Sequence, residues 1–562
     1  MKFDKLKETM RNFDEQFIQE LLEDLKDVLL EWSINKDLMT KNNMIEIVLS
    51  VCGLNLFQKE DFRYKYFCSL DKIGIIKTFL ERAGIVVKTD DQLVLAEKAK
   101  GIPFQENSSY QYLIYDYFGI TDYKFQLSDK EAPVNIVERT GVKFFELFDY
   151  QYMIKQQVVN DLENKEKHLY KILVHMPTGT GKTKTTMHII AHYLNFVSKG
   201  HGTIIWIAHS DELLKQAYST FLSVWSHLAL FEINVYKGWV SFPTAICDGI
   251  LFTSIQALQK KINKPIFDEL QKKASLIIFD EVHKSGASKY KECIDRLMLK
   301  ENEYGKKFIG LTATPGRTTE VSRQNVLFRN DFDHFVGIDV DKINSLSLTE
   351  NEARNYQGSK DPIKYFQEHN YLSRIVVEPL KFELDPVVYE KLKKEFASKR
   401  DDYSESLLKE IGLNKSRNMI IVEKLQELNR NNTPTIVFAC SVQHAKMLSA
   451  FLRLLNIDNS LVTGETGSYE RSKAIGDFKE GKVNIIINYE ILTTGFDSTN
   501  IKCVFITRPT KSVILYSQMI GRGLRGLKMG GNSECKLIDL KDNIEQFDNE
   551  CKAFMHFENY WR

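Results

Sequence analysis

The segment Met176-Pro177-Thr178-Gly179-Thr180-Gly181-Lys182-Thr183 combines residue types that bind phosphate. Glycine at positions 179 and 181 allows backbone conformations that a side chain would obstruct, so successive N–H groups can converge on phosphate oxygens. Lys182 can place a positive charge on the β- and γ-phosphates, and the Thr183 hydroxyl can ligate Mg²⁺. The common pattern has glycine where this chain has Met176. An apolar run precedes the segment and a helical pattern follows it, so it predicts a nucleotide site.

Two adjacent carboxylates, Asp280 and Glu281, directly follow the apolar run Ser275-Leu276-Ile277-Ile278-Phe279. In a nucleotide hydrolase, the first acid of such a pair holds Mg²⁺ and the second polarises the attacking water. An acidic strand end is by itself usually a solvated loop, but here a phosphate loop lies upstream. The pair therefore predicts hydrolysis of a bound nucleotide, with Asp280 at the metal and Glu281 at the water.

Apolar runs alternate with helical segments from Val142 onward, which is typical of parallel-sheet α/β domains. Five runs fit one sheet, and five more fit a second sheet. The first set comprises 172–174, 203–208, 249–252, 275–279 and 307–311, and the second comprises 435–439, 460–462, 483–488, 503–507 and 536–540. The phosphate loop and the carboxylate pair both follow strands of the first set.

Two further motifs complete an ordered set. They are Gly310-Leu311-Thr312-Ala313-Thr314-Pro315-Gly316-Arg317 and Gln518-Met519-Ile520-Gly521-Arg522-Gly523-Leu524-Arg525. Together with the phosphate loop and Asp280-Glu281-Val282-His283, they resemble the motifs of superfamily-2 helicases. Asp361-Pro362-Ile363-Lys364-Tyr365 and Thr493-Thr494-Gly495-Phe496-Asp497 are similar to the branch that holds the helicase subunits of type III restriction enzymes and XPB-like DNA helicases. In this family the loop commonly departs from glycine at the position of Met176.

The resemblance implies an α/β fold with two tandem RecA-like parallel-sheet domains and an N-terminal, mainly helical domain with a winged-helix-like part. The expected boundaries are 1–130 for the N-terminal accessory domain, 143–345 for the ATP-binding RecA-like domain, 346–377 for a connector and 378–562 for the second RecA-like domain. ATP and Mg²⁺ are the implied cofactors.

The resemblance also implies roles at the nucleotide. Arg522 and Arg525, in the motif that begins at Gln518, match the catalytic arginines that reach across from the second domain to the γ-phosphate. A guanidinium supplied by a separate domain acts only when the domains close, so closure would couple hydrolysis to movement. The other positions expected to bind the nucleotide, including the glutamine that reads the adenine edge and a neighbouring aromatic ring, are Tyr150, Gln151, Gly495 and Asp497.

Coupling and nucleic-acid contacts follow in the same way. The residues expected to link the ATP state to domain movement are His283, Thr312 and Thr314. The residues expected to track a nucleic-acid strand are His209, Ser210, Thr253, Ser254, Gln256, Ser441, Thr493 and Thr494. Small hydroxyls and backbone amides at strand ends suit phosphate contacts that read no base sequence, although such hydroxyls also cap helices.

Residues 1–130 follow a different pattern. Apolar residues recur at helical spacing from Phe13 to Leu29 with an acidic excess, so this amphipathic helix should not bind a phosphate backbone. Residues 71–83 predict a helix, and the alternating runs 85–88 and 92–95 predict a hairpin about Asp90 and Asp91. A helix followed by a hairpin is typical of a winged-helix module. Since no concentrated basic face accompanies it, DNA contact and a protein-interaction role both stay open.

Composition sets outer limits. Lys and Arg number 76 against 75 Asp and Glu among 562 residues, a net charge of +1, so any nucleic-acid surface must be local. The eight cysteines form no CxxC pair, the N-terminus lacks the apolar core of a signal peptide, and no apolar run has membrane-spanning length. We therefore expect a cytoplasmic protein with reduced thiols and no membrane contact.

These features predict an ATP-dependent helicase or translocase with nucleic acid as partner, DNA being favoured over RNA. An RNA helicase is the alternative within the same class. From another class, an ATP-gated module could grip duplex and recruit a protein partner through residues 1–130. A third alternative is the motor subunit of a restriction or anti-phage complex whose nuclease is a separate chain.

Overall fold

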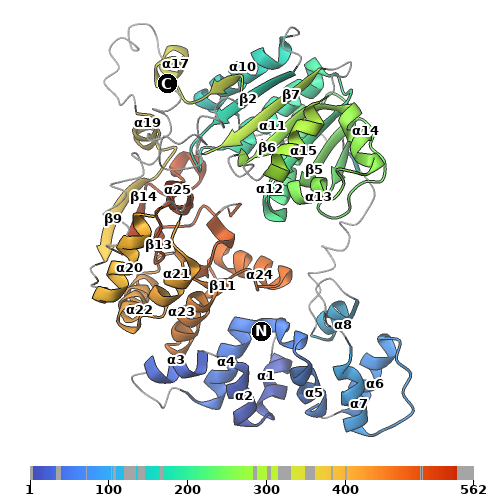
Figure 1. Cartoon of the computed structure of the whole chain (residues 1–562), viewed down its shortest axis with the longest axis vertical. Coiled ribbons are helices and arrows are strands. Elements are labelled where there is room, and N and C mark those ends of the chain that lie inside the picture. Colours follow the sequence, from blue (N-terminus) through green and yellow to red (C-terminus); the bar gives the residue numbers. More distant parts are fainter. Residues whose placement is uncertain are drawn as a thin grey trace.

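The computed structural model consists of a helical N-terminal domain and two α/β lobes (Figure 1). We call residues 4–118 the N-terminal domain, residues 134–347 the first lobe and residues 374–540 the second lobe. The residues that the structure describes are 4–23, 25–32, 39–70, 72–102, 104, 109–118, 134–136, 146–164, 169–282, 288–299, 305–313, 331–347, 361–380, 382, 384–398, 402–493, 495–496 and 498–540.

The first lobe is built on a sheet with the strand order β1-β4-β5-β3-β6-β7-β2-β8. β1 pairs antiparallel with β4, and the other described pairs of this sheet are parallel. The five predicted strands are confirmed as β2, β3, β5, β6 and β7, whereas the apolar pattern misses the strands near the sheet edges. The strands are β1 (Val134–Ile136), β2 (Leu169–His175), β3 (Thr203–Ala208), β4 (Ile233–Lys237), β5 (Gly249–Ser254), β6 (Ala274–Asp280), β7 (Lys306–Thr312) and β8 (His334–Val336).

Alternate residues of the central strands enter cores on opposite faces of this sheet. Ile204 and Trp206 of β3 lie in one core, and Ile205 and Ile207 lie in the other. Both faces are buried, which is why these strands are continuously apolar in sequence. The helices of the first lobe are α10 (Asp149–Glu163), α11 (Lys182–His192), α12 (Asp211–Leu228), α13 (Ile255–Gln259), α14 (Pro265–Lys273), α15 (Ser288–Met298) and α17 (Val340–Ser347).

The second lobe has a parallel sheet with the order β11-β12-β10-β13-β14-β9. Its strands are β9 (Arg374–Leu380), β10 (Thr435–Phe438), β11 (Ser460–Val462), β12 (Ile485–Asn488), β13 (Cys503–Ile506) and β14 (Glu534–Leu540). The five predicted strands are confirmed, and β9, whose residues are exposed or half-buried, adds an edge strand. The helices are α20 (Pro386–Phe396), α21 (Glu405–Gly412), α22 (Lys415–Arg430), α23 (Val442–Leu454), α24 (Ser468–Lys479) and α25 (Val513–Ile520), with α19 (Pro362–Glu368) preceding β9. Two parallel-sheet domains and a helical N-terminal region confirm the predicted fold class.

The described residues of the N-terminal domain form helices and no strand, and the predicted hairpin is wrong. Residues 92–95 begin a helix, because the side chain of Asp91 accepts the backbone N–H groups of Leu93 and Val94 and so acts as an N-cap instead of a turn residue. The first segment is two helices instead of one, since Glu23 adopts a φ of 49° between them. The helices are α1 (Asp4–Arg11), α2 (Glu15–Leu21), α3 (Leu25–Trp32), α4 (Lys41–Cys52), η2 (Gly53–Gln58, 3₁₀), α5 (Glu60–Cys68), α6 (Ile73–Arg82), α7 (Gln92–Lys100) and α8 (Ser109–Tyr117).

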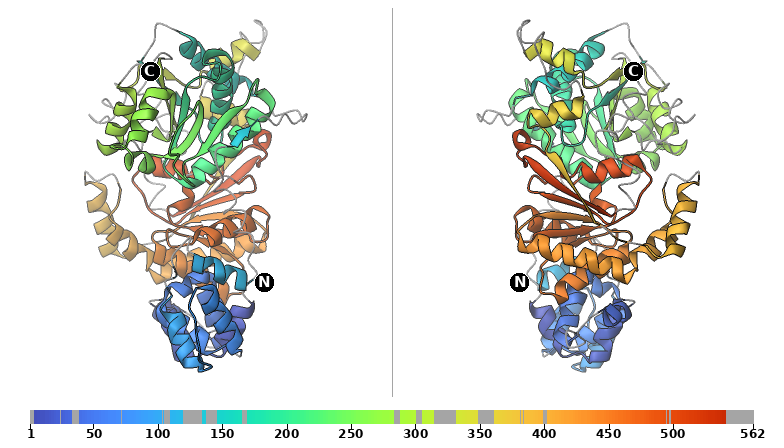
Figure 2. Two further views of the ribbon diagram at one scale, coloured as in Figure 1. Left: turned by 90° about the vertical axis from the view of Figure 1, so that its right-hand side faces the viewer. Right: turned by 90° about the vertical axis from the view of Figure 1, so that its left-hand side faces the viewer.

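The N-terminal domain packs against the second lobe, although the first lobe follows it in sequence. Apolar residues of α1 to α8 form one continuous core with residues of α22, α23 and the second sheet. Figure 2 shows the three parts in a row, with the N-terminal helices at the end opposite the first lobe. In the part of the chain that the structure describes, no helix is both long and apolar enough to cross a bilayer.

Candidate nucleotide-binding site

The loop between β2 and α11 has the backbone geometry of a phosphate cradle. Gly179 and Gly181 adopt φ angles of 85° and 79°, which side chains rarely tolerate. Gly181 caps α11, so the free N–H groups of the first helical turn face the loop. The side chain of Met176 is buried in the core and its N–H donates to Thr312 O at 3.1 Å, which suits a large apolar residue at this position.

Two residues of α10 support this loop from the protein side. The Tyr150 hydroxyl and the Gln151 amide donate to Thr180 O at 2.8 and 2.9 Å, and both side chains are fully buried. The Gln151 amide oxygen accepts the N–H of Phe148 at 3.1 Å. The Thr180 hydroxyl is buried and donates to Pro177 O at 2.7 Å. In this structure, the side chains of all three residues therefore fix the loop itself.

Lys182 lies between the two acidic residues at the end of β6. Its Nζ atom donates to Glu281 Oε1 at 2.7 Å and lies 3.4 Å from Asp280 Oδ1. Burial lowers the pKa of Lys182, but the two carboxylates outweigh burial and raise it, so the ammonium stays charged. Burial raises the pKa of Asp280, against the opposing charge of Lys182. Glu281 adopts a φ of 55°, a strained conformation of the kind that persists at functional sites.

The second lobe supplies the opposite wall of the cleft. A cavity of about 250 Å³ is lined by residues of both lobes, among them the phosphate loop, Asp280 and Glu281. Arg522, Arg525 and Gly495 line the far side. Arg522 is oriented by donating to the carbonyls of Gln518 and Phe496. Gln518 is buried on α25 and is not a lining residue of the cavity.

The two walls touch where the phosphate loop meets the segment after α25. A Cβ atom at Gly521 would lie 2.6 Å from Thr178 Cγ2, so glycine permits this approach. Leu372 and Arg525 lie within ordinary contact distance of Gly179, and these two residues form an isolated β-bridge with each other. The described structure therefore has its lobes closed upon the phosphate loop.

Three hydroxyls predicted to contact nucleic acid cap helices. Ser210, Ser254 and Ser441 each accept the backbone N–H three residues ahead, at 3.3, 3.1 and 3.1 Å, in the first turns of α12, α13 and α23. A capping hydroxyl still has its own proton to donate, so capping and a phosphate contact are compatible. Three of the residues predicted to contact nucleic acid are therefore helix N-caps in the structure.

The other predicted nucleic-acid residues differ in their burial and contacts. Thr253 and Thr493 are buried, and their hydroxyls donate to nearby backbone carbonyls. The His209 ring packs 5.3 Å from a phenylalanine ring of β6, and Gln256 is exposed. Of the coupling residues, Thr312 is buried at the end of β7 beside the phosphate loop. The predicted residues His283, Thr314, Thr494 and Asp497 lie outside the described residues.

Two features of the site have no sequence signal. Leu213, Gln216 and Thr220 of α12 line the cleft, as does Met529. Arg471 of α24 donates to Glu212 of α12 at 2.8 Å and forms an ion pair between the lobes. These residues are 259 positions apart. The spacing of apolar residues could predict the helix α12. The ion pair between Arg471 and Glu212 depends on the relative position of the two lobes, which the sequence does not give.

Comparisons with known proteins agree with this geometry. Residues 144–317 match the family model of the type III restriction enzyme res subunit, and residues 417–526 match the helicase conserved C-terminal domain. The putative ATP-dependent helicase IRC3 of Saccharomyces cerevisiae is 26% identical over 400 residues, covering 70% of this chain and 51% of that protein. The putative mitochondrial ATP-dependent helicase irc3 of Schizosaccharomyces pombe is 26% identical over 426 residues, with coverages of 73% and 61%. The chain thus spans about half to three fifths of these relatives.

Solved structures are similar at lower identity. Mycobacterium smegmatis helicase Lhr, bound to ssDNA and AMP-PNP, gives a TM-score of 0.46 at 15% identity, covering 72% of this chain and 48% of that one. A fragment of a putative HsdR subunit of a type I restriction enzyme from Vibrio vulnificus gives 0.44 at 18% identity, with coverages of 71% and 65%.

Proposed function

Because the chain belongs to the superfamily-2 helicases, a family of ATP-dependent enzymes, we propose that it is a motor that moves along nucleic acid and prefers DNA. The observation that carries this proposal is the cleft between the lobes. One wall of the cleft presents Lys182 with two carboxylates, and the other presents Arg522. Such a cleft can hydrolyse nucleotide only while both lobes line it. The bound nucleotide therefore controls the position of one lobe relative to the other.

We assign the nucleotide phosphates to the loop at 176–181 and the first turn of α11, where N–H groups and Lys182 converge. The donor set fits Mg²⁺, because the Thr183 hydroxyl and the Asp280 carboxylate are hard oxygen ligands at the cleft and phosphate oxygens supply the rest. When bound, Mg²⁺ would neutralise charge on the phosphates. Lys182 then exchanges its carboxylate partners for phosphate oxygens.

Glu281 is the residue we assign to the attacking water. Its Oε1 atom is held by Lys182 in this structure, so the arrival of phosphates would release the carboxylate to accept a proton from water. Arg522 and Arg525 would stabilise the charge that develops on the phosphoryl oxygens. Because these arginines belong to the second lobe, hydrolysis weakens the contact that holds the lobes together.

The strand track proposed here crosses the strand ends of both lobes, at the caps of α12, α13 and α23. Capping hydroxyls and helical N-termini suit phosphate contacts without base readout. DNA is favoured because the res-subunit model matches residues 144–317. RNA remains the second candidate, since proteins named as RNA helicases, including SrmB of Escherichia coli, match 102 to 129 residues of the chain.

An ATPase assay across several nucleic acids tests the proposal directly. We expect single-stranded or forked DNA to stimulate hydrolysis more than RNA of the same sequence, and strand-displacement or triplex-displacement assays to report movement. Stimulation by RNA alone would make the chain an RNA motor. Stimulated hydrolysis without either displacement signal would contradict a motor and support an ATP-gated binding module.

The res-subunit match also supports a motor subunit of a restriction or anti-phage complex as a second candidate. In that case cleavage would come from a partner chain. Co-purification of the full chain from its source tests this, with a nuclease as the expected partner. Recovery of the chain alone with full DNA-stimulated ATPase would contradict it.

A further inference from the structure

The first turn of α24 touches all three parts of the molecule. Tyr469 packs against Tyr115 of the N-terminal domain, with ring centroids 5.3 Å apart. The next residue, Glu470, lies against the 3₁₀ helix η2 of the same domain. Arg471 forms the ion pair with Glu212 of the first lobe. Three consecutive residues of the second lobe therefore contact both of its neighbours.

The contact with the N-terminal domain is closely fitted. Asn55 Nδ2 donates to Glu465 O at 2.9 Å, in the loop that enters α24. A Cβ atom at Gly53 would lie 3.2 Å from Glu470 Cγ, and one at Gly467 would lie 2.5 Å from Glu470 Oε2 and 3.4 Å from Asn55 Oδ1. Because the Glu470 side chain fills the space between two glycines, a shift of α24 must displace η2.

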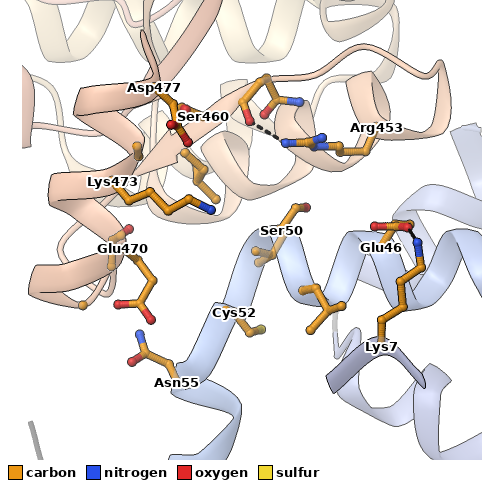
Figure 3. A pocket seen from close by; sticks show the side chains of 18 of the residues that line it. Lys7, Glu46, Ser50, Cys52, Asn55, Arg453, Ser460, Glu470, Lys473 and Asp477 are labelled. Atoms are coloured by element: carbon orange, nitrogen blue, oxygen red, sulfur yellow. Dashed lines mark hydrogen bonds and ion pairs between the residues drawn. The ribbon is translucent and has the colours of Figure 1, made fainter. Parts of the chain in front are cut away.

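The same contact residues, among them Asn55 and Glu470, also line a cavity of about 230 Å³ between the N-terminal domain and the second lobe (Figure 3). Figure 3 shows Glu470 and Lys473 of α24 on one side and Cys52 and Asn55 on the other. Closely packed interiors transmit displacement, whereas a void does not. The direct contacts at the first turn of α24 and the apolar core shared by α4 and α23 are therefore the parts of the seam that can pass movement between the two domains.

The contact with the first lobe leads to the nucleotide. Glu212 lies in the first turn of α12, and the same helix supplies Leu213, Gln216 and Thr220 to the cleft. Arg471 also donates to Thr466 O at 3.2 Å, which fixes the guanidinium to the loop before α24. Burial raises the pKa of Glu212, but the hydrogen bond and charge of Arg471 outweigh burial and lower it. The pair thus joins α24 to a wall of the cleft.

We propose that the first turn of α24 couples the N-terminal domain to closure of the nucleotide cleft, with Arg471 as the positioning residue. With the lobes closed, Glu212 holds Arg471 while Tyr469 and Glu470 lie against α8 and η2, so opening or closing the cleft would move the contact with the N-terminal domain. By linkage, a partner bound to the N-terminal domain changes nucleotide affinity by the factor by which nucleotide changes affinity for that partner. This inference rests on the proposed function, since it requires the lobes to close on nucleotide.

Hydrogen–deuterium exchange of the full chain with Mg²⁺ and AMP-PNP tests the coupling. We expect slower exchange at 176–183, where nucleotide binds, and at 53–58, which lies in another domain, by about fivefold or more at the second segment. Protection at 176–183 without any change at 53–58 would overturn the coupling and leave the nucleotide site intact. Absence of protection at 176–183 would instead contradict the proposed function.

Variants identify the route of the coupling. Glu212→Gln should keep protection at 176–183 and lose it at 53–58, whereas Arg430→Gln, at the exposed end of α22, should change neither. Reversing both charges, with Glu212→Arg and Arg471→Glu in one chain, should restore protection at 53–58. Persistence of that protection in Glu212→Gln, or failure of the reversed pair to restore it, would remove Arg471 from the route.

Discussion

Lys182 is a largely buried charged group whose ion-pair partners in the structure are both acidic. Its Nζ atom lies against the carboxylates of Asp280 and Glu281. The types and spacing of residues 176–183 and 280–281 were enough to predict this cluster, because each group is placed by a strand end and parallel strands end at one sheet edge. Sequence could not predict that Gln151 would bond to Thr180 O, since that contact depends on the packing of α10.

Replacing Lys182 by alanine should abolish ATP hydrolysis. The change removes the positive charge at the phosphates and leaves Asp280 and Glu281 facing each other, so we expect turnover to fall by about 10²-fold or more. Steady-state ATPase measurements with saturating nucleic acid check this. Lys171→Ala, on β2 before the loop, serves as a control, and retained turnover in Lys182→Ala would refute the site.

Glu281→Gln should preserve nucleotide binding and slow hydrolysis. The amide keeps the shape of the side chain but cannot accept a proton from water, so kcat should drop by about 10²- to 10⁴-fold. ATP then persists in the cleft, and the lobes stay closed on nucleic acid. Filter binding with ATP should show a higher nucleic-acid affinity for the variant than for the unchanged protein. Equal affinities would disprove the coupling between ATP hydrolysis and nucleic-acid binding.

At the scale of elements, continuous apolar runs identified the central strands, whereas short or half-exposed strands escaped detection. β9 has only exposed and intermediate positions and lies at the end of its sheet, so it lacks the continuous apolar run of a central strand. The predicted hairpin at 85–95 failed because Asp91 precedes a segment that either a helix or a strand could accommodate. A short apolar segment fits both the helical period of about 3.6 residues and the strand period of 2, so it does not distinguish a helix from a strand.

Gly521→Ala should weaken ATP binding without unfolding the second lobe. The added Cβ atom meets Thr178 Cγ2 of the other lobe at 2.6 Å, so the lobes must separate slightly, and we expect the KM for ATP to rise about tenfold. Gly476→Ala is the matched control, because it lies within α24 with open space around it and should leave KM unchanged. An unchanged KM in Gly521→Ala would mean that catalysis does not need this closed contact.

At the scale of the whole molecule, buried imidazoles make stability depend on pH. Burial lowers the pKa of His188 from 6.5 to about 4, and burial also lowers the pKa of His444 well below 6.5. His444 Nδ1 accepts the N–H of Cys440 at 3.0 Å and Nε2 lies 2.9 Å from Asn418 Oδ1, so the neutral ring donates through Nε2. Both rings are neutral when folded and gain a proton on unfolding once the pH falls below 6.5.

The stability of the protein should therefore be full above pH 6.5 and fall as the pH drops toward 4. Each such histidine contributes up to about 1.4 kcal/mol per pH unit in this window. Urea midpoints followed by tryptophan fluorescence at pH 7.5, 6.5 and 5.5 check the sign. His188→Gln should give a shallower decline than the unchanged protein. Midpoints that rise toward pH 5.5 would contradict the assignment of neutral rings.

The apolar core shared by the N-terminal domain and the second lobe has a consequence for how the chain is made. Described apolar residues between positions 6 and 118 pack against others between positions 421 and 540, so the segment synthesised first must await the segment synthesised near the end. At ordinary rates of translation, roughly 15 to 60 seconds pass before β10 follows α8 out of the ribosome. During that interval the apolar faces of α3 and α4 lack their partner α23, and chaperones would find their binding surface there.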